Sequence, residues 1–487
     1  MTKCNHILCF ICLWLTACSF APPYQPPPIP ISDHYKETVS WVLAKPSLES
    51  AKKKNIWWSV YGDEALNALE QQLTRSNPSL KLAYSRFQEA LALVQAARSQ
   101  LYPTILANGG ESRQKNSKET ANSFNQSTFI YNTLTLQAYL SYEVDVWGEI
   151  RNTIAASTHG ARASQFDMAA IDLSLHAELA TIYFQLRGDN ASQIALDKIV
   201  KSYQHALYLV HQLHQGGAVS ALEEDQAVSR LEHAKTAAID MRLERAKLQH
   251  ALAVLVGEIP ATFCLPPLRA PIKFVALSPQ SPSTLLEQRP DVAAALQQVK
   301  AANAMIGVAR AAFFPNFTLS SLVGYQSQKL SHLFSKPSLI WALGPPSGLT
   351  LTPPEISQIV FDGYYLQANL KKAKATYYET VNYYQQVVLK AFQEVEDGLV
   401  ETYRLNQENQ KQVASTAAAK RALYQANQRM KEGMDTYLNV VDIEVTALQL
   451  ELDLIAIQTQ RQVASVYLIK ALGGGWKVRR ALKACDR

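Results

Sequence analysis

Cysteine is scarce in this chain and unevenly placed. The sequence has 6 cysteines among 487 residues, and only Cys264 and Cys485 lie beyond residue 18. Two distant cysteines are too few for a disulfide scaffold or a four-thiolate zinc site. They either pair with each other in an oxidising compartment or remain free thiols, and the sequence leaves both interpretations open.

Long apolar runs are also absent after Ala17. Hydrophobic residues make up 48% of the chain and charged residues 18%, yet no stretch of about 18 consecutive apolar residues occurs. The sequence therefore predicts no transmembrane helix. The net charge of +6 is spread along the chain rather than clustered, which disfavours a nucleic-acid partner.

Catalytic and nucleotide-binding motifs are missing as well: there is no P-loop, no G-x-G-x-x-G, no G-x-S-x-G and no H-E-x-x-H. His211 and His214 share a helix face, but no third ligand or carboxylate partner is apparent, so we interpret them as part of a solvated face. Glu143 and Asp145 lie on the same side of a predicted strand as Gln137, and we interpret them as its polar lining. We therefore predict no enzymatic activity, no cofactor and no metal.

What is present begins with a targeting segment. Lys3 precedes an apolar run of about 9 residues, Ile7 to Leu15, the size of a signal h-region. The run ends in Leu15-Thr16-Ala17-Cys18, which resembles a bacterial lipobox, in which the cysteine is acylated after residues 1–17 are removed. Ser19, rather than an inner-membrane retention aspartate, favours the outer membrane. The alternative is an ordinary secretory signal. Residues 18–55, rich in proline at their start, are predicted to form an extended leash.

The rest of the chain contains an internal repeat. Pro78 to Pro103 aligns without gaps over Pro290 to Pro315, with seven identities at one constant shift. Further on, Gly217/Gly433 and Gly257/Gly473 match each other at a common, slightly longer shift. We therefore predict a first repeat over residues 56–260, a linker over 261–285, a second repeat over 286–476 and a tail over 477–487.

Each repeat begins with a helix and continues with two strands. The helices end at the X-Pro steps before Pro103 and Pro315, and Arg289-Pro290-Asp291 is interpreted as the start of the second one. Residues 134–146 alternate apolar and polar side chains, which indicates a strand. In the second repeat, strands are expected at 317–322 and 339–361, the latter interrupted at Gly344 to Pro346. Loops are predicted at Gly109 to Asn125 and Gln326 to Ser338. Soluble hairpins packed on a core remain an alternative.

The pattern then becomes helical in both repeats. From 151 to about 216, and from 363 to about 432, apolar residues recur at steps of 3 and 4, which predicts packing as coiled coils. A helix of about 66 residues spans roughly 100 Å. Each long helix is expected to turn at glycine and to return as a partner of about 38 residues, ending at Gly257 or Gly473.

The ordered motifs resemble those of one family, the outer-membrane factors of tripartite efflux pumps (the TolC and OprM-like channels), in the lipoprotein branch. The motifs are Trp57-Trp58 with Tyr61-Gly62-Asp63, Ser141 to Gly148, Arg289 to Asp291, Ala301 to Asn303 with Ile306-Gly307, Phe313 to Pro315, Phe361 to Gly363, Glu394 to Asp397, Tyr437 to Asp442 and Ala471 to Trp476. The likeness runs from Cys18 to Trp476. One departure is Pro345-Pro346, before the fourth strand.

This resemblance implies a mainly helical fold with a membrane β-barrel. Three chains would each contribute four strands to a 12-stranded barrel in the outer membrane, continued by a coiled-coil α-helical barrel in the periplasm. Four strands cannot span a membrane as an open sheet, and single-chain barrels begin near 8 strands. Several chains must therefore combine their strands. Two or three would close, and only the resemblance selects the homotrimer.

The resemblance also implies partners and working residues. An inner-membrane RND-type pump would supply the energy, and a periplasmic adaptor would connect the pump to this passive duct for small molecules. The tips expected to meet the adaptor are Gly217, Ala218, Val219, Ser220, Gly433, Met434, Asp435 and Thr436. Polar groups expected near a periplasmic gate are Gln212, Arg429, Glu432 and Asp435.

Three other functions compete with this interpretation. The outer component of type I protein secretion belongs to the same class, but the lipobox and the Ala471 to Trp476 ending favour small-molecule efflux. A periplasmic coiled-coil scaffold lipoprotein would share the anchor and the heptads, yet it would have no need of paired amphipathic strands. A periplasmic enzyme is the weakest option, since no catalytic constellation is present.

Overall fold

The computed structural model describes residues 19–28, 36, 56–115, 130–265, 288–344 and 355–474. The predictions that concern Cys18, Trp476 and Cys485 lie outside these residues; Cys264 is exposed. The chain forms two compact units: unit 1 combines 1–27, 87–164 and 295–384, and unit 2 combines 28–86, 165–294 and 385–487. The domain boundaries drawn from the sequence stay predictions.

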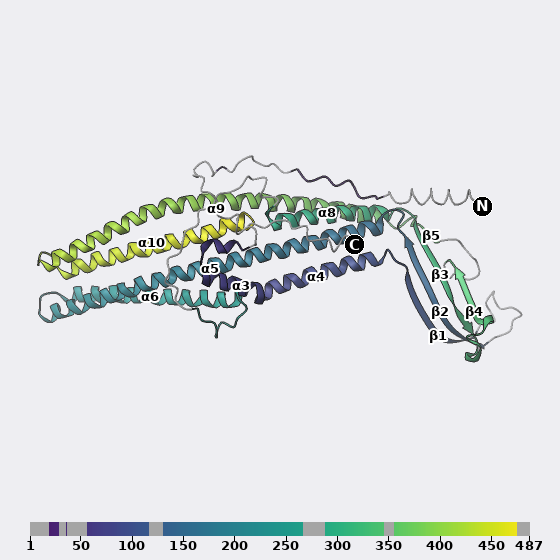
Figure 1. Ribbon diagram of the computed structural model, residues 1–487, viewed down its shortest axis with the longest axis horizontal. Helices are drawn as coiled ribbons and strands as arrows, with labels where there is room; N and C mark the ends of the chain where they lie inside the picture. Colours follow the sequence, from purple (N-terminus) through teal and green to yellow (C-terminus); the bar gives the residue numbers. More distant parts are fainter. Residues whose placement is uncertain are drawn as a thin grey trace. The chain divides into compact units, whose positions relative to one another are not determined.

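Unit 1 contains one antiparallel sheet (Figure 1). Its strands β1 (Thr104–Lys115), β2 (Ile130–Val144), β3 (Asn316–Ser327) and β4 (Leu339–Leu343) lie in that order. The short β5 (Glu355–Ser357) pairs with residues 316–318 of β3, whereas β4 pairs with residues 321–325. Together β4 and β5 occupy the place of one interrupted fourth strand, as the prolines predicted. Two short 3-10 helices, η4 (Leu330–His332) and η5 (Lys336–Ser338), form the loop before β4.

The predicted loop from Gly109 is wrong at its start. Gly109 and Gly110 continue β1 and stand opposite Leu136 and Thr135 of β2, and the strand extends to Lys115. A Cβ added at Gly109 would lie 3.5 Å from Leu136 Cδ1, so the exposed glycine is in contact with this side chain of the neighbouring strand. Two consecutive glycines indicate a loop when only the sequence is known. Here they stay in the strand, because each of them pairs with a residue of β2.

Asp145 corrects a second interpretation. It follows β2, and instead of lining the strand it caps α5 (Glu149–Gln215). Its carboxylate accepts hydrogen bonds from the backbone N–H groups of Ile150 at 3.2 Å and Arg151 at 2.9 Å. It also pairs with Arg151 Nε at 2.9 Å. A carboxylate at a helix N-terminus satisfies free N–H groups and favours the positive end of the helix dipole.

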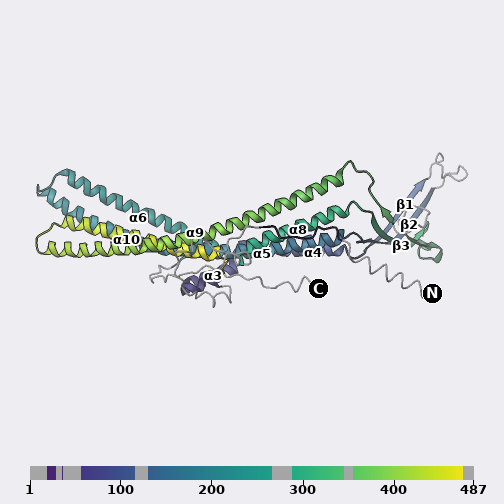
Figure 2. The ribbon, with the colours of Figure 1, turned by 90° about the horizontal axis from the view of Figure 1, so that it is seen from above.

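Unit 2 is helical. It contains η2 (Trp57–Tyr61), α3 (Glu64–Ser76), α6 (Ala221–Leu255), α10 (Tyr437–Ala471) and parts of α5 and α9 (Tyr365–Lys431). The α5–α6 and α9–α10 hairpins lie side by side in both views (Figure 1 and Figure 2). The remaining long helices, α4 (Pro78–Ser99) and α8 (Pro290–Ala311), each contribute residues to both units. None of the described helices is both long and apolar enough to cross a membrane.

A buried polar cluster accounts for the Trp57 to Asp63 motif. Asp63 caps α3 by accepting from the backbone N–H groups of Ala65 and Leu66. It also pairs with the buried Arg187 of α5. In the same core Trp58 stacks on His176, with ring centroids 4.3 Å apart. The motif therefore joins the short N-terminal helices to α5, because buried charges are stable only when they are paired.

The structure confirms the duplication. α4 and β1 repeat as α8 and β3 at one constant shift, and α5 and α6 repeat as α9 and α10 at a slightly longer one. The long helices have 67 residues each and their partners 35 each. The difference between the two shifts arises in the strand region, where the second repeat carries the broken fourth strand.

Candidate functional site

The first hairpin of unit 2 turns at glycine. α5 ends at Gln215, and Gly217 follows with φ of 69°. Gly217 N donates to His214 O at 2.9 Å, and Ala218 N donates to Leu213 O at 2.8 Å, which is a Schellman motif. The motif needs a left-handed residue, which glycine adopts without strain.

The chain then enters α6 through a capping box. Ser220 is the N-cap, and its backbone N donates to Glu223 Oε2 at 3.0 Å. Just before it, Val219 O accepts a hydrogen bond from His214 Nδ1 at 3.0 Å. The loop is thus held from both helices, so its four residues are presented in a defined shape.

The second hairpin repeats this turn. Gly433 has φ of 72°, its N donates to Met430 O at 3.0 Å, and Met434 N donates to Arg429 O at 2.9 Å. Thr436 caps α10 by accepting from Asn439 N at 3.3 Å. All eight predicted tip residues therefore lie in two equivalent turns. A Cβ added at Gly217 or Gly433 would meet nothing within 4 Å.

Of the predicted gate residues, the structure brings one pair together. Arg429 Nε lies 3.7 Å from Asp435 Oδ2, and Asp435 also accepts from Asn439 Nδ2 at 2.9 Å. Both members of the pair belong to the second hairpin. Gln212, near the end of α5, and Glu432, just after α9, are exposed. The pair therefore stiffens one turn without joining the two hairpins.

The histidines of the first hairpin lie on an exposed face, as interpreted from the sequence, but they do have a carboxylate partner. His211 Nδ1 lies 2.7 Å from Glu224 Oε1, and His214 Nε2 lies 3.7 Å from Glu224 Oε2. Glu224 is on α6, and a partner from the returning helix was not visible in a single helix face. Within the ranges that the structure describes, no cluster of three or more side chains could hold a metal ion.

An apolar seam packs the two hairpins together. Its buried residues come from α5, α6 and α10 and are Leu196, Ile199, Ala234, Ala238 and Leu448. Tyr203, Met241, Val445 and Leu452 pack against them. Val445, Leu448 and Leu452 recur along α10 at steps of 3 and 4, the spacing of a coiled-coil seam. The seam supplies non-directional attraction, so it sets proximity more than register.

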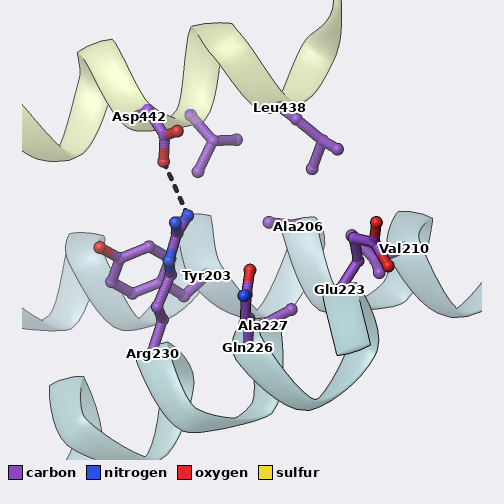
Figure 3. Close-up of a pocket in the computed structure, with 10 residues that line it drawn as sticks. Tyr203, Ala206, Val210, Glu223, Gln226, Ala227, Arg230, Leu438 and Asp442 are labelled. Carbon is purple, nitrogen blue, oxygen red and sulfur yellow. Dashed lines mark hydrogen bonds and ion pairs between the residues drawn. The ribbon is translucent and has the colours of Figure 1, made fainter. Parts of the chain in front are cut away.

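Closer to the turns the seam gives way to a pocket of about 220 Å³ (Figure 3). Its lining includes Tyr203 and Val210 of α5 and Leu438 of α10. Arg230 of α6 reaches across it, and Arg230 Nη1 lies 3.0 Å from Asp442 Oδ1 of α10 (Figure 3). The side chains are 54% and 58% exposed. This is a direct ionic link from the first hairpin to the second.

Sequence reasoning missed this link, although a signal for it existed. Arg230 precedes the buried Leu231, and Asp442 follows the buried Val441. Charged residues that flank a coiled-coil seam often form ion pairs between helices. The sequence shows which residues flank a seam, but not which helix faces which. The pairing therefore needed the structure.

Comparisons with known proteins agree with the duplicated fold described above. The family model for "Outer membrane efflux protein" matches residues 69–258 and 281–474. The chain is 30% identical over 475 residues to the outer membrane protein OprJ of Pseudomonas aeruginosa, covering 97% of this chain and 96% of OprJ. The fold is similar to the Campylobacter jejuni CmeC outer membrane channel, with a TM-score of 0.85, 25% identity and coverage of 96% and 98%.

The fold is also similar to the open state of the Neisseria gonorrhoeae MtrE outer membrane channel. The TM-score is 0.81 at 27% identity, and the match covers 94% of this chain and 99% of MtrE. The family model alone matches more than half of the chain, in two copies that agree with the duplicated helices and strands. The chain belongs to the outer membrane efflux protein family, as a non-enzymatic outer membrane channel of an efflux pump.

Proposed function

We propose that three copies of this chain close their strands into one 12-stranded barrel and form a passive exit duct for small molecules. The observation that carries the proposal is the sheet of unit 1, in which β1 and β4 are the terminal strands. Unpaired strand edges in hydrocarbon cost several kcal/mol per backbone group, so they must pair with neighbouring copies. Two copies would give a narrower barrel, and the family likeness favours three.

One face of the sheet supports a lipid contact. The register puts Leu136, Tyr325 and Leu339 side by side, and likewise Ala138, Val323 and Trp341. Exposed apolar side chains gather on this face, namely Ile105 (69% exposed), Leu136 (43%), Val323 (53%), Leu339 (48%), Trp341 (63%) and Leu343 (63%). The opposite face carries Thr135, Gln137 and Tyr139, suited to a polar lumen. A patch of six exposed apolar side chains on one face of a sheet favours contact with a membrane.

For the gate we propose the link between the hairpins. In this proposal the periplasmic end widens when the α9–α10 hairpin moves away from α5–α6, which separates Arg230 from Asp442. Of the predicted gate residues, Arg429 and Asp435 form their ion pair within one hairpin, and this pair would survive that movement. The Arg230–Asp442 link is therefore the better candidate to hold a closed state, and breaking it would accompany opening.

For the partners we propose that a periplasmic adaptor meets the two turns at Gly217 and Gly433, and that an inner-membrane RND-type pump drives transport. Two equivalent turns give each chain two similar docking positions, so a trimer would present six. Both turns are exposed, and Met434 is 59% exposed, which gives an adaptor hairpin apolar surface to pack on. For the membrane anchor we propose acylation of Cys18.

The gate proposal predicts a leak when the link is removed. An exposed ion pair contributes about 0.2–1 kcal/mol, so three pairs lost in a trimer shift the closed–open equilibrium by roughly 0.6–3 kcal/mol, about 3- to 150-fold. Arg230→Ala should raise the open probability in planar bilayers and admit a large hydrophilic antibiotic into cells. Arg242→Ala is the matched control, because Arg242 pairs with Asp197 at 3.1 Å inside the first hairpin.

Restoring the link in reverse should restore closure. The double variant Arg230→Asp with Asp442→Arg should leak far less than either single variant. Equal leak in Arg230→Ala and Arg242→Ala, or no recovery in the double variant, would show that the link does not hold the gate.

The docking proposal predicts that bulk at the turns abolishes efflux. Gly217→Leu and Gly433→Leu place a side chain in open space, so the folding cost is mainly the left-handed strain of about 1–2 kcal/mol per residue. Assembly and membrane insertion should persist while the efflux of a fluorescent substrate is lost. Gly62→Leu is the control, since Gly62 also has a positive φ of 64° and nothing within 4 Å. Variants that fail to assemble would leave the turns with a structural role alone.

The barrel proposal predicts unequal tolerance of charge on the two faces of β2. Leu136→Arg should cost about 2–4 kcal/mol if the residue faces lipid near the membrane midplane, whereas Gln137→Arg should be mild. The measurement is the unfolding free energy in lipid vesicles, with the amount recovered in outer membranes as support. Equal tolerance at both positions would refute this assignment of faces.

The anchor proposal predicts that a palmitate analogue labels the wild-type protein and not Cys18→Ser. Acylation is expected at this residue because the cysteine ends the lipobox-like stretch. Several buried acyl chains, at about 0.8 kcal/mol per CH₂, make a durable anchor. The readout is in-gel detection of the label after growth with the analogue. Label on both proteins would contradict acylation at Cys18.

A further inference from the structure

The segment directly after Cys18 lies in a built site of unit 1. The ring of Phe20 stacks on Phe314 with centroids 4.4 Å apart and an angle of 9°. The Phe20 ring also stacks on Trp147, with centroids 5.9 Å apart and an angle of 25° between the rings. The indole is itself held, because Trp147 Nε1 donates to Pro315 O at 2.8 Å. Phe20 thus completes a group of aromatic rings in which stacking adds to the burial of apolar area.

Side chains also recognise the backbone of this segment. Arg310 Nη1 donates to Phe20 O at 3.2 Å, and Asn303 Nδ2 donates to Pro22 O at 2.9 Å. Asn303 is buried, with only 8% of its surface exposed. Prolines at 22 and 23 remove backbone N–H groups that would otherwise need acceptors. The site therefore provides donors for the carbonyls of an extended, proline-containing segment.

The floor of the site requires glycine. A Cβ added at Gly307 of α8 would lie 2.5 Å from Asn152 Nδ2 and 2.9 Å from Ala21 Cα. Asn152, on α5, accepts a hydrogen bond from Ser19 Oγ at 3.1 Å. At the other end Lys300 Nζ lies 5.2 Å from the centre of the Tyr24 ring, a cation–π contact. Close backbone approach, buried amides and paired rings distinguish this site from a surface over which a chain merely passes.

The residues of the site come from both repeats. Trp147 and Asn152 follow β2 in the first repeat, whereas Asn303, Gly307 and Arg310 precede β3 in the second. Trp147, Asn303 and Gly307 belong to motifs shared with the family that the duct, gate and turns do not explain. β2 and β3 are paired strands whose register ends at Val144 opposite Phe317. The docked segment thus spans the junction between the repeats at the base of these two strands.

We propose that Ser19 to Tyr24 is a clasp: an intramolecular peptide ligand that joins the two repeats at the base of β2 and β3 and fixes where the anchor is attached. The ligand class is an extended aromatic–proline peptide, supplied by the chain itself. The attachment role rests on the proposed acylation of Cys18, whereas the clasp itself does not. Because one peptide bond separates residue 18 from the clasp, docking holds the anchor at the strands that enter the membrane.

Protease protection of the full-length protein in detergent tests the clasp. Chymotrypsin cleaves after Phe20 and Tyr24, and intact mass reports the loss of the N-terminal residues. Cleavage of a docked segment requires opening, so the wild type should be cut at least about tenfold more slowly than Gly307→Ala or Phe314→Ala. Gly160→Ala is the control, because it makes the same change in α5 with nothing within 4 Å. It should match the wild type.

A second measurement covers the case in which Gly307→Ala fails to fold. A photoreactive phenylalanine analogue at position 20 of the otherwise wild-type chain should crosslink to the peptides that contain Trp147 or Phe314. Wild-type cleavage as fast as that of Gly307→Ala, or crosslinks elsewhere, would overturn the clasp.

Cys18→Ser separates the clasp from the anchor. If the groove holds the segment, this variant should remain protected from chymotrypsin whether or not the wild type takes up the palmitate analogue. Loss of protection in Cys18→Ser would show that the lipid, rather than the groove, holds the segment, and would overturn the inference.

Discussion

The backbone hydrogen bonds of the terminal strands are the constraint on which the rest of this structure depends. A sheet ordered β1-β2-β3-β4 leaves one side of β1 and one side of β4 for strands from elsewhere. In an outer membrane channel those groups face hydrocarbon unless another strand pairs with them. The proposed closure by further copies follows from that cost.

The two repeats contain the same long helices, whereas sequence differences between them make the contacts of the two hairpins unequal. The repeats match residue for residue in the lengths of their long helices. When the turn glycines of the two hairpins are aligned, Arg230 corresponds to Thr446 and Asp442 corresponds to Gln226. Only one of the two symmetric links therefore exists, with its cation on the first hairpin and its anion on the second. A single link of modest strength suits a gate, because it can be broken without unfolding the seam.

Local patterns predicted much of this fold. The heptads and the glycine turns placed the ends of α5 and α9 within about two residues, since helix periodicity and C-terminal capping are local in sequence. Local patterns gave wrong assignments where a contact with another part of the chain determines the structure. Gly109 was assigned to a loop because its cross-strand partner was unknown. Asp145 was assigned to a strand face because its contact with Arg151 depends on the turn between them.

The candidate site was predictable in part for the same reason. Both turns were located by their glycines, while the Arg230–Asp442 link and the carboxylate between His211 and His214 join separate helices.

The central claim, closure of one barrel by three chains, is tested most directly by native mass spectrometry of the protein extracted from outer membranes in detergent. The account predicts a mass of three chains. A stable species of one or two chains that still conducts in a bilayer would contradict it.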